Sequence, residues 1–299
     1  MAQMEHIVVQ TGEYPRVDSP VHRTPKGTPY LVHPGVITLA RPALNKTALA
    51  PFVDGFPADL GFKASVSDPV PLTSGAGLCK LAGQLCYMSF GPKRTTNAQA
   101  ERYFANILSS GHGSVLEHAA FSFLAFGISR SVTHELVRHR AGFAFSQVSQ
   151  RYVSGQTLRF VERPEFQQSD DLHTEFTERI DHVALAHASL ENRLRELQSD
   201  GAEVLSADGQ TGRRKRIHQA ARALLTNEVE APIVVTGNVR AWRHFIEARA
   251  NEHADVEIRL LAYALFRCLS AMEPILFGDY QTIHLADGTC AVSTGTPKV

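Results

Sequence analysis

The chain has 299 residues, of which 43% are hydrophobic and 20% charged, a composition typical of a globular protein with one large or two modest domains. Its 30 Lys and Arg balance its 30 Asp and Glu, which disfavours a general nucleic-acid-binding protein and makes any anion site local. No apolar run reaches the ~20 residues of a membrane span and no signal-peptide layout is present, so we expect a cytoplasmic protein without membrane contact. The cysteines are too few and scattered for a disulfide framework and are expected to be reduced thiols: Cys79, Cys86, Cys268 and Cys290.

Residues 1–75 are predicted to form an irregular N-terminal extension that packs on the main body. They hold ten of the 15 prolines, and proline breaks helices and interrupts central strands. Short β-rich pieces at 30–32 and 36–39 lie among these prolines. A catalytic domain is expected over 76–275, followed by a C-terminal tail over 276–299.

Hydrophobic spacing predicts an α/β core. Thr96 or Asn97 and Ser129 are expected to cap two of its helices. In chain order, we expect helices at 78–87 and 96–110, a strand at 119–128, helices at 129–137, 170–198 and 213–225, a strand at 232–236, and helices at 239–250 and 255–272.

The basic triplet Arg138-His139-Arg140 stands at the C-terminal end of the 129–137 helix. The planar fork of arginine binds phosphate at two points. His139 lies between two arginines and should resist a further charge, so we expect a neutral imidazole. Phe143 and Phe145, in the loop that follows, could wall a flat ring. This pattern indicates a site for an anion that carries a planar ring, and the alternative is a solvated basic helix end, where cations favour the last carbonyls.

No motif for metal binding or covalent catalysis accompanies the triplet. His112 and His118 fit a zinc site loosely and nothing completes a ligand set, so no metal is expected. No nucleophile elbow, Walker loop or Rossmann fingerprint is present. The run at 213–216 is interpreted as the solvated face of a helix. The remaining polar residues bind and polarise, so the hard chemistry would have to come from a cofactor.

Four segments together resemble the flavin-dependent thymidylate synthases, over roughly residues 76–275 and in that family's order. The first is the triplet with the polar run 146–152, and the others are 111–118, 219–222 and 237–249. The downstream stretch 251–259 also resembles the family. One departure is the spacing between Arg140 and Ser149, which is eight residues here where the family usually has seven.

The resemblance implies a central, mostly antiparallel sheet flanked by helices, and a homotetramer with its sites at subunit interfaces. FAD would be held at positions matching Ser114, Arg138, His139, Arg140, Gln147, Asn238, Arg240 and His244. The substrate dUMP would contact positions matching Glu135, Arg138, Gln147, Val148, Ser149, Gln150, Arg151, Arg222 and Arg249.

The implied reaction is the reductive methylation of dUMP at C5, with methylenetetrahydrofolate as methylene donor, NADPH as reductant of FAD, and dTMP as product. Arg249 matches the residue that activates the uracil ring, where a cation would stabilise negative charge developing on the ring. Two alternatives stay open. The longer 141–148 loop could admit UMP, as in a UMP C5-methylase of a nucleoside-antibiotic pathway. The basic segments could instead belong to a nucleic-acid-binding module.

Overall fold

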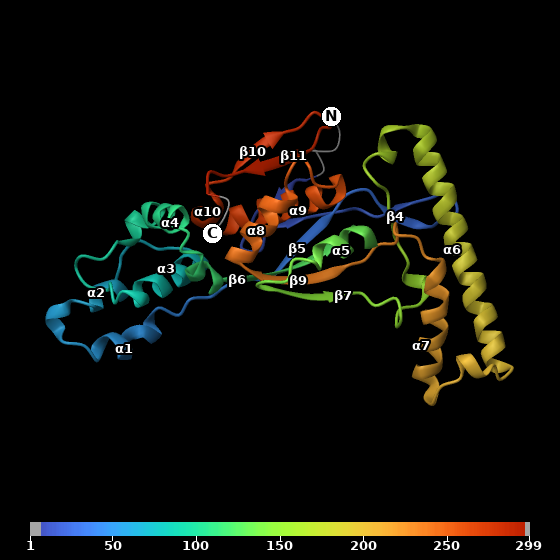
Figure 1. The fold of residues 1–299 in the computed structure, drawn as a ribbon, viewed down its shortest axis with the longest axis horizontal. Coiled ribbons are helices and arrows are strands. Elements are labelled where there is room, and N and C mark those ends of the chain that lie inside the picture. The colour runs from blue at the N-terminus through green and yellow to red at the C-terminus, as the bar shows by residue number, and fades with distance from the viewer. Residues whose placement is uncertain (1–6, 297–299) are drawn as a thin grey trace.

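A six-stranded antiparallel sheet forms the centre of the computed structural model, which describes residues 7–296 (Figure 1). The strand order is β1-β2-β5-β6-β9-β7. The strands are β1 (Val9–Gln10), β2 (Arg16–Val17), β5 (Gly35–Ala40), β6 (Ala120–Phe126), β9 (Ile233–Asn238) and β7 (Phe143–Gln147). Their pairings are all antiparallel, which confirms the expected mixed α/β fold with an antiparallel sheet.

One face of this sheet carries the core. Along β6, Phe121, Phe123 and Ala125 are buried while their neighbours are half-buried, which is the period of two that a half-covered strand requires. Helices α8 (Val239–Arg249) and α9 (Val256–Met272) lie on the buried side (Figure 1). The other face, with Leu124 on β6 and Val234 on β9, is left partly open.

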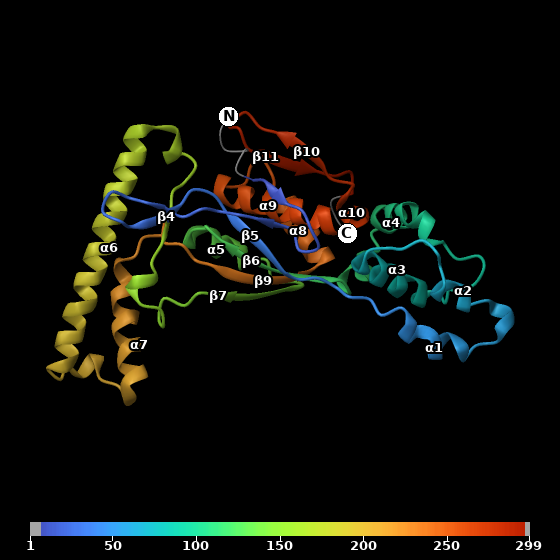
Figure 2. The same cartoon turned by 180° about the vertical axis from the view of Figure 1, so that it is seen from behind.

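The remaining elements extend the molecule at both ends of the sheet (Figures 1 and 2). One end holds α1 (Ala50–Asp54), α2 (Lys63–Val66), α3 (Ser74–Cys86) and α4 (Ala100–Ser109). The other end holds the antiparallel pair α6 (Asp170–Ser199) and α7 (Gly209–Ala221) beside the small sheet β3 (His22–Arg23), β4 (Pro29–Leu31) and β8 (Phe160–Val161). Between them are α5 (Arg130–Leu136), α10 (Pro274–Phe277) and the hairpin of β10 (Gln281–His284) and β11 (Cys290–Ser293). Short 3-10 turns are Thr47–Leu49, Ala58–Leu60, Asn97–Gln99, Gly113–Glu117, Gly155–Thr157, Phe166–Gln168, Glu203–Leu205 and Arg222–Leu224.

Most predicted elements of the core are found within a few residues of their expected bounds. Thr96 forms a capping box with Gln99, and the Ser129 hydroxyl accepts from the Val132 amide, so both predicted caps are confirmed. Helix α7 begins at Gly209, four residues before the predicted start.

Two expectations are wrong. The N-terminal segment is not irregular throughout, because β5 pairs along its length with β6 and β2 pairs with β5, which makes them part of the central sheet. The segment after the triplet is not a loop, because β7 pairs with β9 from Phe143 opposite Gly237 to Gln147 opposite Ile233. The division of the chain at residues 76 and 276 stays a prediction, and residues 1–6 and 297–299 lie outside the described part.

Helix α8 is tied to the C-terminal segment through Arg243, whose side chain is completely buried. Its guanidinium donates to both carboxylate oxygens of Asp279, at 2.7 and 2.6 Å, and to the Leu276 carbonyl at 2.7 Å. At the end of the helix, the Val292 amide of β11 donates to the Ala250 carbonyl at 2.8 Å. These contacts fix the helix that carries His244 and Arg249.

No helix within residues 7–296 is long and apolar enough to cross a membrane. The four cysteines are all unpaired, and three of them, Cys79, Cys268 and Cys290, are buried. Burial raises the pKa of Cys79 and of Cys268 to about 12, so neither is a ready nucleophile.

Candidate active site

A hollow of about 440 Å³ lies where the end of α5, the turn before β7 and helix α8 meet. We call it the triplet hollow. It is lined by Arg138, His139, Arg140, Ala141, Phe143, His244 and Arg249. The structure therefore brings the basic triplet together with two residues about 100 positions later in the chain, as the predicted site requires.

Arg249 is held at the inner wall of this hollow by two partners. Its Nη1 donates to the Glu135 carboxylate on α5 at 2.8 Å, and its Nε donates to Nε2 of His139 at 3.0 Å. The Arg249 side chain is 24% exposed and that of Glu135 is 35% exposed. This inter-helix ion pair and the hydrogen bond to His139 orient the cation that lines the hollow.

His139 is a neutral imidazole at neutral pH, as predicted. Burial, the nearby Arg249 cation and His244 lower its pKa to about 4. Because Nε2 accepts from Arg249, the ring proton lies on Nδ1. The predicted cause was the flanking pair of arginines, and the structure replaces it with burial and Arg249. The ring packs edge-on against Phe245, with the ring centroids 5.2 Å apart.

Several predicted cofactor residues do not line the hollow and lie at the start of α8 or on the 3-10 turn Gly113–Glu117, which contacts α8. Asn238 caps α8, with its side-chain oxygen accepting from the Ala241 amide at 2.9 Å. Arg240 is exposed and pairs with Glu117 at 2.6 Å, a partner that the sequence did not indicate. Ser114 is exposed in the same 3-10 turn as Glu117. Gly142 adopts a φ of 76° before β7, where a Cβ would stand 2.9 Å from Nδ2 of Asn238.

A second hollow, of about 380 Å³, lies beyond the other end of β7, beside α6 and α7. We call it the cationic hollow. Its lining is Arg151, Tyr152, Ser154, Arg195, Thr211, Arg214, Lys215 and His218. Four of these residues carry a permanent positive charge and none is acidic, which suits a phosphate group.

The 213–216 run is largely solvated, as interpreted, because Arg213, Arg214 and Arg216 are exposed, and its half-buried member Lys215 lines the cationic hollow together with Arg214. The Nζ atom of Lys215 lies 5.1 Å from the centroid of the Tyr152 ring. A hydrogen bond from Lys215 and its charge lower the pKa of Tyr152. No local signal identifies Lys215, because Arg222, seven residues later, does not line the cationic hollow.

The segment from Gln147 to Arg151 runs from β7 to the cationic hollow. Gln147 closes the strand opposite Ile233, and the Val148 amide donates to the Pro232 carbonyl at 2.9 Å. The Ser149 hydroxyl accepts from the Arg151 amide at 3.4 Å. Arg222 is exposed where α7 ends and is not among the residues that line the cationic hollow.

The two hollows lie at opposite ends of β7. Five antiparallel residues span about 17 Å at ~3.4 Å each. One chain therefore does not place Arg249 next to Ser149 and Arg151, although the sequence predicts that these residues contact one nucleotide. The predicted site residues form two groups, and their roles stay predictions.

Comparisons with known proteins agree with the resemblance. Residues 72–275 match the family described as thymidylate synthase complementing protein. The chain is 46% identical over 215 residues to a flavin-dependent thymidylate synthase of Mycolicibacterium gilvum, covering 72% of this chain and 83% of that protein. It is 47% identical over 218 residues to the flavin-dependent thymidylate synthases of Mycobacterium tuberculosis and Mycolicibacterium vanbaalenii, with the same coverage. The chain therefore belongs to the thymidylate synthase complementing protein family, the family of the flavin-dependent thymidylate synthases.

Proposed function

We propose that this protein converts dUMP to dTMP by reductive methylation at C5, with FAD, NADPH and methylenetetrahydrofolate. The observation that carries the proposal is the composition of the triplet hollow. In this member of the family, the hollow contains a neutral His139 and an oriented Arg249 beside the exposed Arg138 and Arg140. A flavin ring needs an uncharged flat neighbour, and its diphosphate needs cations.

The residues of the triplet hollow fit FAD. Within the described chain, no hydrogen bond or ion pair engages the side chains of Arg138 and Arg140, so both can bind a diphosphate. His139 and Phe143 line the hollow and would place aromatic rings beside a planar group. Asn238, Arg240, His244, Ser114 and Gln147 would complete the cofactor contacts. When bound, FAD supplies the hydride that this chain's own side chains cannot provide.

The cationic hollow is the proposed place of the dUMP phosphate. Arg151 lines the hollow on the strand side, with Ser149 two residues earlier as a further donor, and Lys215 and Arg214 supply cations from α7. Arg222 would contribute from the end of the same helix, with Val148 and Gln150 flanking. At the other end of the nucleotide, Arg249 would stabilise negative charge on the uracil ring, with Glu135 keeping it in place.

We propose a homotetramer in which the triplet hollow of one subunit faces the cationic hollow of another. The separation of the two hollows within one chain supports this arrangement. The open face of the sheet supports it as well, because Leu124, Val234 and the exposed Ala144 and Ser146 offer a flat, uncharged surface to a second copy.

We infer a preference for dUMP over UMP from the position of the additional residue in the segment 141–148. Strand β7 pairs with β9 without a bulge, so the additional residue is accommodated in the turn at Ala141 and Gly142. That turn borders the triplet hollow, at the far end of β7 from Ser149. A ribonucleotide preference, as in a nucleoside-antibiotic UMP C5-methylase, would contradict this argument, and kcat/KM for dUMP and UMP measured side by side tests it.

The main experiment is an absorbance spectrum followed by a kinetic assay. Purified protein should be yellow and should oxidise NADPH faster when dUMP is added. Light scattering at micromolar protein should give the mass of a tetramer. Colourless protein that cannot be reconstituted with FAD would refute the proposal. Oligonucleotide binding with a steep salt dependence, in place of these results, would indicate a nucleic-acid-binding module.

A further inference from the structure

A buried carboxylate lies in the first turn of helix α9, at the opposite end of helix α5 from the triplet hollow. It belongs to Glu257, which is only 2% exposed. Both of its oxygens accept from Ser129, with the Ser129 amide donating to Oε1 and the hydroxyl to Oε2, each at 2.7 Å. Ser129 caps α5, because its hydroxyl oxygen accepts from the Val132 amide. The carboxylate therefore holds both polar groups of the capping residue that face it.

The charge on Glu257 determines how the Ser129 hydroxyl is used. An ionised carboxylate only accepts hydrogen bonds, so the hydroxyl donates to it and the hydroxyl oxygen stays available to the Val132 amide. A protonated carboxyl group, or the amide of a glutamine, presents a donor to the hydroxyl and competes with Val132 for that oxygen. Protonation of Glu257 thus weakens the N-cap, and losing an N-cap interaction destabilises the start of a helix.

Helix α5 connects this cap to the triplet hollow. The helix has only seven residues, about two turns, so its cap is a large part of what stabilises it. Glu135 stands in its last turn and binds Arg249 at 2.8 Å, and the basic triplet begins two residues after the helix ends. A change at the start of so short a helix alters the placement of Glu135, and with it the orientation of Arg249.

On the α9 side, two charged side chains act on Glu257. Nη1 of Arg163 lies 4.0 Å from Oε2 of Glu257, and Asp255, which caps α9, adds a second negative charge. Arg163 also pairs with Asp255 at 2.8 Å and with Glu165 at 2.9 Å. Because its charge is shared among three carboxylates, Arg163 only partly stabilises the ionised form of Glu257.

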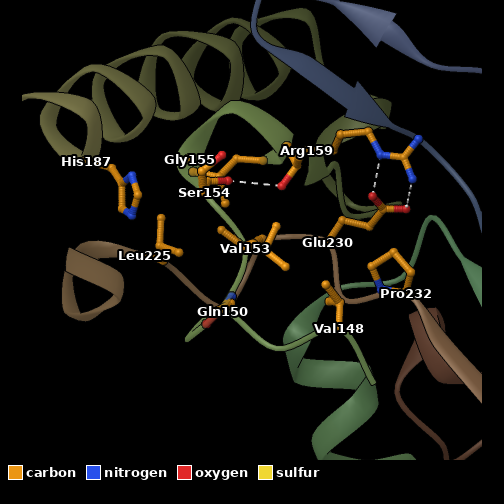
Figure 3. Close-up of a pocket in the computed structure, with 13 residues that line it drawn as sticks. Val148, Gln150, Val153, Ser154, Gly155, Arg159, His187, Leu225, Glu230 and Pro232 are labelled. Carbon is orange, nitrogen blue, oxygen red and sulfur yellow. Dashed lines mark hydrogen bonds and ion pairs between the residues drawn. The ribbon is translucent and has the colours of Figure 1, made fainter. Parts of the chain in front are cut away.

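On the α5 side, the nearest carboxylate is already neutralised. Glu230 forms a backbone bridge with Ser129, and its side chain accepts from Arg159 at both oxygens, at 2.5 and 2.9 Å (Figure 3). Burial therefore dominates at Glu257. It outweighs the bonds from Ser129 and the Arg163 charge and raises the pKa of Glu257 to about 7.

We propose that Glu257 is a positioning residue, whose ionised carboxylate holds the Ser129 cap and thereby aligns Glu135 and Arg249 for turnover. The proposal rests on the function proposed above for the triplet hollow. Glu257 lines neither the triplet hollow nor the cationic hollow, so it acts through Ser129 and α5. Because protonation weakens the cap, turnover should fall as the pH drops through about 7.

The kinetic test compares Glu257→Gln with the parent, and Glu165→Gln is the matched control, because Glu165 pairs with the same Arg163 but is exposed. At pH 8, Glu257→Gln should lower kcat on the order of 5-fold, as the loss of one cap allows. The KM for dUMP should change less than about twofold, because the cationic hollow is untouched. The fall in kcat of the parent between pH 8 and pH 6 should be absent in Glu257→Gln and unchanged in Glu165→Gln.

Hydrogen exchange tests the same step without turnover, in the full-length protein as purified. The protection factors of the α5 amides should fall on the order of 5-fold in Glu257→Gln and in Ser129→Ala. The double variant should resemble Ser129→Ala alone, because both substitutions break the same cap. The pKa of Glu257 is raised in the folded chain, so the ionised group costs stability as pH rises from 4.5 to 7. Removing its charge offsets the lost cap, and the Tm of Glu257→Gln at pH 8 should lie within about 4 °C of the parent.

A kcat, pH profile and α5 exchange like those of the parent in Glu257→Gln would overturn the proposal. Losses in Ser129→Ala and Glu257→Gln that add in the double variant would also overturn it, as would an equal kcat loss in Glu165→Gln. A large fall in Tm without a specific change in α5 exchange would show a general loss of stability in place of positioning. A parent without dUMP-dependent turnover would refute the proposed function, whereas the exchange data alone decide whether Glu257 controls α5.

Discussion

Replacing Arg249 with alanine should abolish most turnover while FAD stays bound. The substitution removes a cation from the position proposed for the uracil ring, where negative charge would develop in the transition state. Removing one such stabilising donor typically lowers kcat by about 10²–10³-fold, or ~3–4 kcal/mol. Six other side chains continue to line the triplet hollow, so the flavin should remain.

The structural cost of this substitution is small by comparison. The Arg249–Glu135 pair is partly exposed, at 24% and 35%, and such pairs contribute roughly 0.2–1 kcal/mol to stability. An activation barrier raised by ~3 kcal/mol is therefore larger than the loss of folding stability that the broken ion pair can cause. Arg179→Ala on α6 removes a similar pair, with Glu228 at 2.6 Å, and serves as the control.

The assay is dUMP-dependent NADPH oxidation at saturating substrates, with flavin content read from absorbance. Turnover of Arg249→Ala within about threefold of the parent would refute the assigned role, because a threefold change is below 1 kcal/mol. Colourless Arg249→Ala protein would refute it differently, by showing that Arg249 holds the cofactor. A comparable kcat loss in Arg179→Ala would attribute the effect to ion-pair loss in general.

Three further outcomes are expected. Lys215→Met should raise the KM for dUMP on the order of 10-fold with kcat retained, because it removes one charge-assisted phosphate contact. Arg213→Met is the control and should leave KM unchanged, because Arg213 belongs to the same run but does not line the cationic hollow. A larger rise in KM for Arg213→Met than for Lys215→Met would refute the placement of the phosphate. The pKa of His139 is lowered to about 4 in the folded chain, so between about pH 6.5 and 4 the unfolded chain binds a proton at His139 that the folded chain does not bind. Stability should therefore fall as pH drops from about 6.5 toward 4, and urea unfolding of His139→Phe should show a shallower fall. Gly142→Ala should lose about 1–2 kcal/mol of unfolding free energy, because alanine is strained at this φ of 76° and its Cβ would crowd Asn238; unchanged urea unfolding would contradict that strain.

The sequence predicted elements whose pattern is local and missed those that depend on a distant partner. Strand β6 was recognisable because its buried residues alternate over seven positions. Strand β7 was not, since Phe143–Gln147 mixes small, aromatic and polar residues and becomes a strand by pairing with β9, about 90 positions later. The two-residue strands β1 and β2 are too short to show any period.

The same distinction applies to the site. The triplet and Arg249 were identifiable as motifs, but the bond from Arg249 to His139 joins residues 110 positions apart and has no local signature. Lys215 was missed because a charge run is usually solvated. Among the described residues, the buried Nε2 of Gln150 and Nδ1 of His187 have no hydrogen-bond partner, and this could not be predicted from the sequence, because an absent partner is a property of packing.

The order of strands in the central sheet also determines when this chain can fold. Strand β5 ends at residue 40, its neighbour β6 begins at residue 120, and β9, which β6 also needs, begins at residue 233. The entropy of closing such long loops is lost before the strand pairs stabilise the sheet, and this slows folding. The sheet therefore belongs to the class of slow-folding structures with high contact order. During synthesis at ~5–20 residues per second, β6 waits on the order of ten seconds for β9 and for α8 and α9, and Phe121 and Phe123 stay uncovered in that time. The nascent chain is thus exposed to aggregation in that interval, and a chaperone that shields β6 would raise the yield of folded protein.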